Sequence, residues 1–437
     1  MEQILENAGK TLYPRLALYE ALAVYKGEHK RRQLARDESD DTCEIRRDFL
    51  DSFAYLCDIE KGGATVTAAG LQKLPYSNIL WLAANEGIRN TVHLYAKSVL
   101  RQLVLVNSEE TELRVREEVF QRAVQMCTPR LIFYNNEVRL CARKCRMELR
   151  KQLPDDAVSA LRRKLRKLSE PPISFTIAHI VDLCYGMRGH EVDAIKKRST
   201  HSQDDFGKLA HYIGRLGATR CSVNTVVKAM RQVPALRQIT DIRVIEEPNA
   251  LHITISTENM IPYEIVWAIS KDSVSQNTLD IQSALHNLIN LDPPLNDGTS
   301  NPIRINLANR RTIVTRVHAE LQICDQFSRH GFEFVADDKY IGCSKPACYF
   351  CYNWLVNHKH KYVQPATHYK IIPGCRGPDN DINESGATIL KEMYSKMTLR
   401  VGQDIIDFLL HVGGREAAGR THQYLSTEGT SRATSAV

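Results

Sequence analysis

VHAELQIC at residues 317–324 and YIGCSKPACYFC at residues 340–351 decide the fold of the C-terminal half. The first stretch contains His318 and Glu320 in an H-x-E pattern, and the second contains Cys348 and Cys351 in a C-x-x-C pattern. Each pattern alone arises easily by chance. Together, each at the start of a predicted helix that follows a strand-like segment, they indicate one site shared by two helix N-termini.

Zinc chemistry explains why these residue types occur together. One neutral imidazole and two thiolates can hold zinc with three protein ligands, which leaves the fourth position for water. The metal lowers the pKa of that water to about 7 and supplies hydroxide at neutral pH. His318, Cys348 and Cys351 are therefore the predicted zinc ligands, and the positive end of a helix dipole favours the thiolate form of the cysteines.

Glu320 is the predicted proton shuttle. Hydrolytic removal of an exocyclic amine from a nucleobase needs a carboxyl group that takes a proton from water and delivers it to the ring and to the leaving ammonia. Residues i and i+2 do not face each other in the middle of a helix. His318 and Glu320 can therefore share a site only at the very start of the helix.

The two stretches resemble the cytidine deaminase-like superfamily, and YIGCSKPACYFC is most similar to a branch common in fungi. The resemblance covers roughly residues 315–375. It implies an α/β domain of three layers, a mixed sheet with helices on both faces, and zinc held by His318, Cys348 and Cys351 with Glu320 as the shuttle. The implied substrate is a nucleobase in a nucleoside, nucleotide or nucleic acid, with cytosine as the first guess.

The sequence departs from the superfamily pattern at one position. Proline usually stands directly before the first cysteine, whereas here Ala347 lies between Pro346 and Cys348. The insertion shifts the turn that enters the helix and weakens the assignment of backbone donors between Ser344 and Cys348. It does not affect the ligands.

A non-catalytic interaction protein with structural zinc is the alternative. Cys343 lies five residues before Cys348, and His358 or His360 could complete a closed Cys3His set with the C-x-x-C pair. In that case His318 would be a core histidine and Glu320 a carboxylate at a helix N-terminus. We interpret Cys343 as a buried strand residue near the site, because the closed set leaves the H-x-E pattern unexplained.

The 437 residues predict two or three domains. We expect a mostly helical N-terminal region over 1–240, an α/β zinc domain over 241–414 and a disordered tail over 415–437, which is rich in Ser, Thr, Gly and Ala. The periodicity predicts helices at 43–57, 88–106, 222–233 (capped by Ser222), 318–329, 347–360 and 387–412, and strands at 251–256, 339–343 and 368–372.

Composition constrains the class of protein only loosely. The 58 Lys and Arg against 51 Asp and Glu give a net charge of +7, which is mildly basic and does not by itself indicate nucleic acid. No signal peptide and no membrane-spanning segment are recognisable, so we expect an intracellular protein whose 12 cysteines are free, buried or metal-bound. Cys375, in a Gly/Pro loop, has no evident role.

Several other features are weaker candidates. Residues 138–168 form a predicted basic helix with 11 Lys and Arg that could bind nucleic acid, although a solvated face is the preferred interpretation. His368 could face the pocket. A polar loop before His318 could contact substrate, and its residues are Asn306, Asn309 and Arg311. An aromatic cluster around the cysteines could stack on a base or form core, and its residues are Tyr349, Phe350, Tyr352 and Trp354.

Overall fold

The computed structural model divides the chain into two compact units. It describes residues 2–22, 30–35, 41–151, 155–200, 204–255, 260–272, 278–291, 303, 305, 307, 310–379 and 384–412. The first unit comprises Met1–Arg31, Pro248–Leu321 and Ala347–His422, and the second comprises Arg32–Glu247, Gln322–Pro346 and Gln423–Val437. The start of the chain thus belongs with its C-terminal part. The domains 1–240 and 241–414 stay a prediction, and the tail 415–437 lies outside the described residues.

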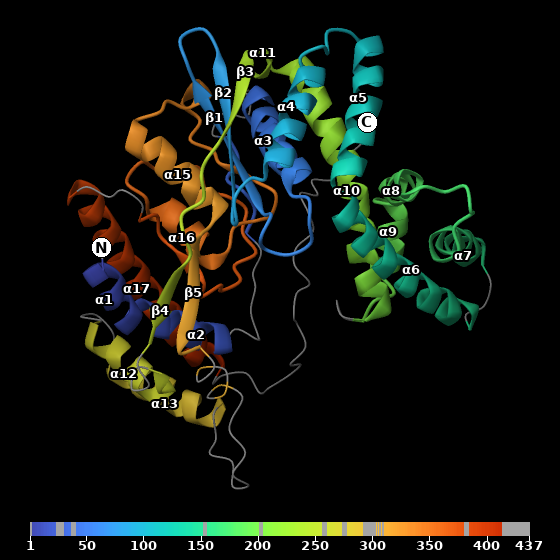
Figure 1. The fold of residues 1–437 in the computed structure, drawn as a ribbon. Coiled ribbons are helices and arrows are strands. Elements are labelled where there is room, and N and C mark those ends of the chain that lie inside the picture. Colours follow the sequence, from blue (N-terminus) through green and yellow to red (C-terminus); the bar gives the residue numbers. More distant parts are fainter. Residues whose placement is uncertain are drawn as a thin grey trace. The chain divides into compact units, whose positions relative to one another are not determined.

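The first unit contains a mixed three-stranded sheet in the order β4-β5-β7, of which Figure 1 labels β4 and β5. Its strands are β4 (Leu251–Thr254), β5 (Thr312–Val317) and β7 (Cys375–Arg376). β4 pairs with β5 antiparallel, and β5 pairs with β7 parallel. Along β5 the side chains of Ile313, Thr315 and Val317 are buried, as the pleat of a strand with one covered face requires.

Helices surround this sheet. They are α1 (Glu2–Lys10), α2 (Leu12–Leu22), α12 (Pro262–Asp272), α13 (Thr278–Leu291), α16 (Tyr349–Asn357) and α17 (Glu384–Val412). α17 packs against α2, α12, α13 and α16. Its apolar residues recur at helical spacing and are buried, and they include Leu390, Met397, Val401, Ile405 and Leu409. The long C-terminal helix is therefore the centre of this core, and it agrees with the helix predicted over 387–412.

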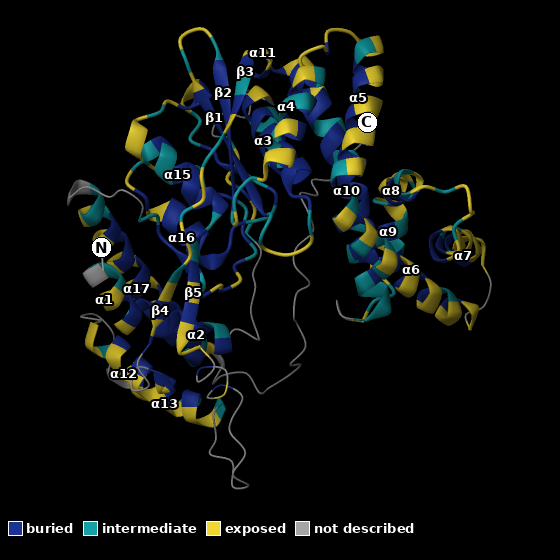
Figure 2. Ribbon diagram, in the orientation of Figure 1, coloured by how far each residue is buried: buried dark blue, intermediate teal, exposed yellow. Residues whose placement is uncertain are grey.

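The second unit contains a four-stranded sheet in the order β3-β2-β1-β6. Its strands are β1 (Thr67–Lys73), β2 (Asn78–Ala84), β3 (Ile239–Val244) and β6 (Gly342–Cys343). Its helices are α3 (Asp41–Cys57), α4 (Asn90–Leu103), α5 (Glu109–Met126), α6 (Thr128–Arg150), α7 (Asp156–Ser169), α8 (Ile177–Gly186), α9 (His190–Lys196), α10 (Asp205–Gln232) and α11 (Pro234–Arg237), with a 3₁₀ turn at Val335–Asp337. β1 and β2 are buried almost throughout, whereas α6 and α7 each have an exposed face (Figure 2).

One further helix, α15 (Ala319–His330), begins in the first unit, and most of its residues belong to the second. The helical N-terminal region and the mixed sheets are consistent with the predicted α/β class. None of the helices in the described part of the chain combines the length and apolar character that a membrane span requires.

Four details of the secondary-structure prediction were wrong. β1 and β2 were missed, because a fully buried apolar run has no alternation to reveal it. Ser222 does not cap a helix but is buried inside α10. The basic segment 138–168 is not one helix but parts of α6 and α7. Residues 368–372 form no strand, and the pairing next to them consists of two isolated bridges, from Thr367 to Lys30 and from Thr367 to Ala347.

Candidate metal centre

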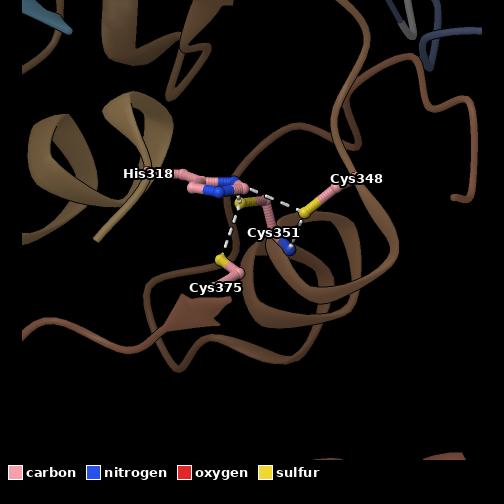
Figure 3. A group of neighbouring side chains, drawn as sticks. All are labelled: His318, Cys348, Cys351 and Cys375. Carbon is pink, nitrogen blue, oxygen red and sulfur yellow. Dashed lines mark hydrogen bonds between the residues drawn. The ribbon is translucent and has the colours of Figure 1, made fainter. Parts of the chain in front are cut away.

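Four side chains of the first unit converge on one point (Figure 3). They are His318, Cys348, Cys351 and Cys375, and their ligand atoms all lie within 4.8 Å of one another. The three cysteines are fully buried, and the histidine is half-buried. The structure thus brings together the three predicted ligands and adds a fourth donor.

The spacing of these atoms fits a tetrahedral zinc ion. Bonds of about 2.3 Å to sulfur and about 2.0 Å to nitrogen separate ligand atoms by about 3.5 Å (N to S) or about 3.8 Å (S to S). Nδ1 of His318 lies 3.6 Å from Sγ of Cys348 and 3.4 Å from Sγ of Cys351. The Sγ atoms of Cys351 and Cys375 lie 3.6 Å apart. The donor set and its dimensions therefore fit the metal that the sequence predicts.

His318 stands between β5 and α15. The strand ends at Val317 and the helix begins at Ala319, and the carbonyl oxygen of His318 accepts a hydrogen bond from the N–H of Leu321 at 2.9 Å. His318 is therefore in the capping position of the helix, and Glu320 is in its first turn. This is the helix-start geometry that an H-x-E pair needs in order to share a site.

Cys348 caps α16. Its backbone is extended (φ −74°, ψ 171°), and its sulfur accepts a hydrogen bond from the N–H of Cys351 at 3.5 Å. Cys351 lies within the first turn of the same helix. Both sulfurs are thus at the positive end of the helix dipole, which stabilises the thiolate form.

The turn before Cys348 explains why alanine precedes it. The N–H of Ala347 donates to the carbonyl of Ala366 at 2.8 Å. The carbonyl of Ala347 accepts from the Thr367 hydroxyl at 2.6 Å and from the His368 N–H at 3.2 Å. A proline in this position would lack the N–H and lose the first of these bonds. Segment 366–368 therefore fixes the entry to α16.

Cys375 was assigned no role from the sequence, but the structure places its sulfur in the donor cluster. It begins β7, whose parallel register sets Cys375 opposite Arg316, two residues before His318. The N–H of Arg316 also donates to the carbonyl of Gly374 at 2.8 Å. Strand pairing therefore delivers a third sulfur to the site. No local spacing signals this, because the partner strand is about sixty residues away in sequence.

The groups of the cluster shift one another's pKa values. Burial raises the pKa of the Cys348 thiol, but hydrogen bonds from Cys351 and Cys375 and the charge of His318 lower it well below its ordinary value. Burial lowers the pKa of His318, but the charges of Cys375 and Cys348 raise it well above its ordinary value. Burial raises the pKa of Cys375 to about 12. A metal ion would take the place of the protons that these groups share.

Glu320 lies beside the cluster. Its side chain is only 4% exposed, and its Oε2 accepts no hydrogen bond from the described residues. Burial raises the pKa of this carboxyl group, whereas the charge of His318 and a hydrogen bond from Cys351 lower it. A buried carboxylate oxygen without a partner is costly unless a further group binds there.

Residues 317–379 match the model of a deaminase-like family described as OTT_1508_deam. The chain contains a deaminase-like region. The match includes Glu320 and all four donors of the cluster. Searches of curated proteins and of solved structures found no match to this chain.

The structure also shows the surroundings of the other candidate residues in the deaminase-like region. The four aromatic residues of α16 are core: Tyr349, Phe350, Tyr352 and Trp354 are all at most 7% exposed. Nδ1 of His368 accepts a hydrogen bond from the N–H of Lys370 at 3.0 Å. Among the described residues, the donor cluster includes neither Cys343 nor His358 nor His360.

The polar residues before His318 provide little further evidence about the site. Asn306 and Asn309 lie outside the described residues. Arg311 is exposed. A substrate-facing role for this loop therefore stays a prediction.

Proposed function

We propose that this chain is a zinc-dependent hydrolytic deaminase of a nucleobase in a nucleoside, nucleotide or nucleic acid, with cytosine as the first candidate. The proposal includes a cytidine deaminase-like fold for the region around the site. The observation that carries it is the convergence of His318, Cys348 and Cys351 beside the buried carboxyl group of Glu320. The match to a deaminase-like family supports it.

In this proposal each residue has a separate task. His318, Cys348 and Cys351 would hold zinc, which when bound lowers the pKa of water to about 7. Glu320 takes a proton at its unpartnered Oε2 and passes it to the ring and to the leaving amine. The raised pKa of Glu320 suits this task, because a group that both takes and gives a proton works best when its pKa lies near the ambient pH.

A structural zinc site in an interaction protein is the second candidate. The observation that favours it is Cys375, which completes a Cys3His set of four protein donors. Structural zinc sites are closed in this way, whereas catalytic sites keep one position open. This set differs from the closed set considered from the sequence, which combined Cys343 and either His358 or His360 with the C-x-x-C pair.

Metal analysis and a substrate screen test the proposal together. We expect one zinc per purified chain and ammonia release from a cytosine, adenine or guanine substrate, offered as nucleosides, nucleotides and single strands. Activity that disappears on chelation and returns with zinc would support the deaminase. A chain that is fully loaded with zinc and inert on every substrate would favour the structural site.

A further inference from the structure

The segment Gly374–Gly377 is built to fix the position of Cys375. A Cβ atom on Gly374 would lie 2.9 Å from the carbonyl oxygen of Val314, and one on Gly377 would clash with the Trp354 ring. Neither position accepts a larger residue without a shift of the surrounding structure. The two glycines thus let β7 approach both β5 and α16 closely.

Arg376 anchors the same segment. Its guanidinium donates to the carbonyls of Thr315 at 3.0 Å and Asn249 at 2.8 Å, and it pairs with Asp379 at 2.9 Å. The side chains of Arg376 and Asp379 are only 1% and 3% exposed, so the pair is rigidly enclosed. The Tyr13 hydroxyl donates to the carbonyl of Cys375 at 3.3 Å. The backbone of Cys375 is therefore held on both sides.

The anchored segment places the sulfur of Cys375 in the donor cluster. A buried cysteine usually serves as a small hydrophobe. Here the sulfur of Cys375 faces His318 and Cys351 across the space that a metal would fill (Figure 3). Its 3.6 Å separation from Sγ of Cys351 is the spacing of two ligands on one tetrahedral zinc.

We propose that Cys375 is the fourth metal ligand and that it closes the site in the resting chain. The thiolate of Cys375 would then occupy the ligand position that the attacking water needs. Because the backbone of Cys375 is held by these contacts, rotation of the Cys375 side chain would free that position. The inhibitory effect rests on the proposed deaminase function, whereas the coordination does not.

Cobalt substitution tests the coordination without any assay of activity. Thiolate-to-cobalt charge transfer absorbs in the near ultraviolet with an intensity that grows with the number of bound thiolates. Cys375→Ala removes one of the three sulfur ligands, so its charge-transfer absorption should be lower than that of the parent by about one third. Cys375→Ser, which keeps the side chain nearly the same size, should show the same loss. Azide should shift the spectrum of Cys375→Ala at a concentration that leaves the spectrum of the parent unchanged.

Cys343→Ser is the matched control, because Cys343 is outside the donor cluster, and it should keep the parent spectrum. Equal charge-transfer intensity in the parent and in both Cys375 variants would overturn the assignment. So would an azide response in the parent as large as that of Cys375→Ala at the same azide concentration, because in the parent the anion must first displace the sulfur of Cys375. Circular dichroism would verify that each variant is folded.

Turnover provides the second arm. If the proposed deaminase function holds, Cys375→Ala should be at least about tenfold more active than the parent, because its water position is open from the start. A parent as active as Cys375→Ala would refute closure even if the cobalt spectra support coordination. Inert proteins with the expected cobalt spectra would refute the deaminase function and leave Cys375 as a ligand.

Discussion

Replacement of Glu320 by glutamine tests the proposed proton shuttle separately from the candidate metal site. Glutamine keeps the size of the side chain and removes its ability to take a proton. The loss of a positioned acid/base group lowers a rate by about 10²–10⁴-fold, or about 3–5 kcal/mol of barrier. Glu320 would serve more than one proton transfer, so we expect a loss at or beyond the upper end of that range.

The structure also predicts how Glu320→Gln affects stability. Oε2 of Glu320 is buried without a partner among the described residues, and an unsatisfied buried acceptor costs about 1–3 kcal/mol. A neutral amide is less costly to bury than a carboxylate, so thermal stability should be unchanged or higher. The zinc content should equal that of the parent, because Glu320 is not among the four donors.

The assay is ammonia release under single-turnover and steady-state conditions, with zinc measured on the same samples. Glu112→Gln on α5 is the matched control, since Glu112 is also buried but lies in the second unit. It should keep its activity. Retention of most activity in Glu320→Gln would refute the mechanism, and a loss of zinc in that variant would show that Glu320 acts on the metal instead.

The remaining predictions concern the ligands and the basic helices. Cys348→Ala and Cys351→Ala should each lose zinc and melt at a lower temperature than the parent, because the ion ties α16 to the end of β5; full zinc retention in both would contradict the ligand assignment. The exposed basic residues of α7 are Arg163, Arg166 and Lys167. If α7 binds single-stranded nucleic acid, neutralising these three residues should make the affinity less dependent on salt concentration. An unchanged salt dependence would mean that these residues form an ordinary solvated face.

Basic side chains of both α6 and α7 pair with acidic ones. Lys164 pairs with Glu191, and Arg146 pairs with Glu170. On α7 the residues Val158, Leu161, Leu165 and Leu168 are buried, so its charged residues occupy what remains of an amphipathic helix. The pairing with acidic side chains is what an ordinary solvated face shows.

Local sequence predicted the parts of the site that depend on local structure. The starts of α15 and α16 follow from a capping position and from apolar periodicity, and both can be recognised within a few residues. His318, Glu320, Cys348 and Cys351 could therefore be placed on helix N-termini from the residue pattern alone. Their three-dimensional convergence followed from the zinc chemistry that explains their residue types.

Cys375 could not be found in this way, because strand pairing and not local spacing brings it to the site. β7 has only two residues, and its parallel register with β5 depends on the close approach that Gly374 and Gly377 permit. A short buried strand has no periodicity to detect. The buried strands β1 and β2 were missed for a related reason, since their apolar runs are as compatible with a helix as with a sheet.

Glu320 and Cys375 favour opposite functions when each is considered alone. A closed structural zinc site has no use for a buried carboxylate whose Oε2 lacks a partner among the described residues. An open catalytic site has no use for a third sulfur at ligand distance, fixed by Arg376 and two glycines. A catalytic site that Cys375 closes at rest accounts for both residues. In that case Glu320 acts during turnover, whereas the thiolate of Cys375 occupies the site before turnover begins. The double variant Glu320→Gln with Cys375→Ala separates these roles: it should keep the open cobalt spectrum of Cys375→Ala and lose the activity that the single change confers.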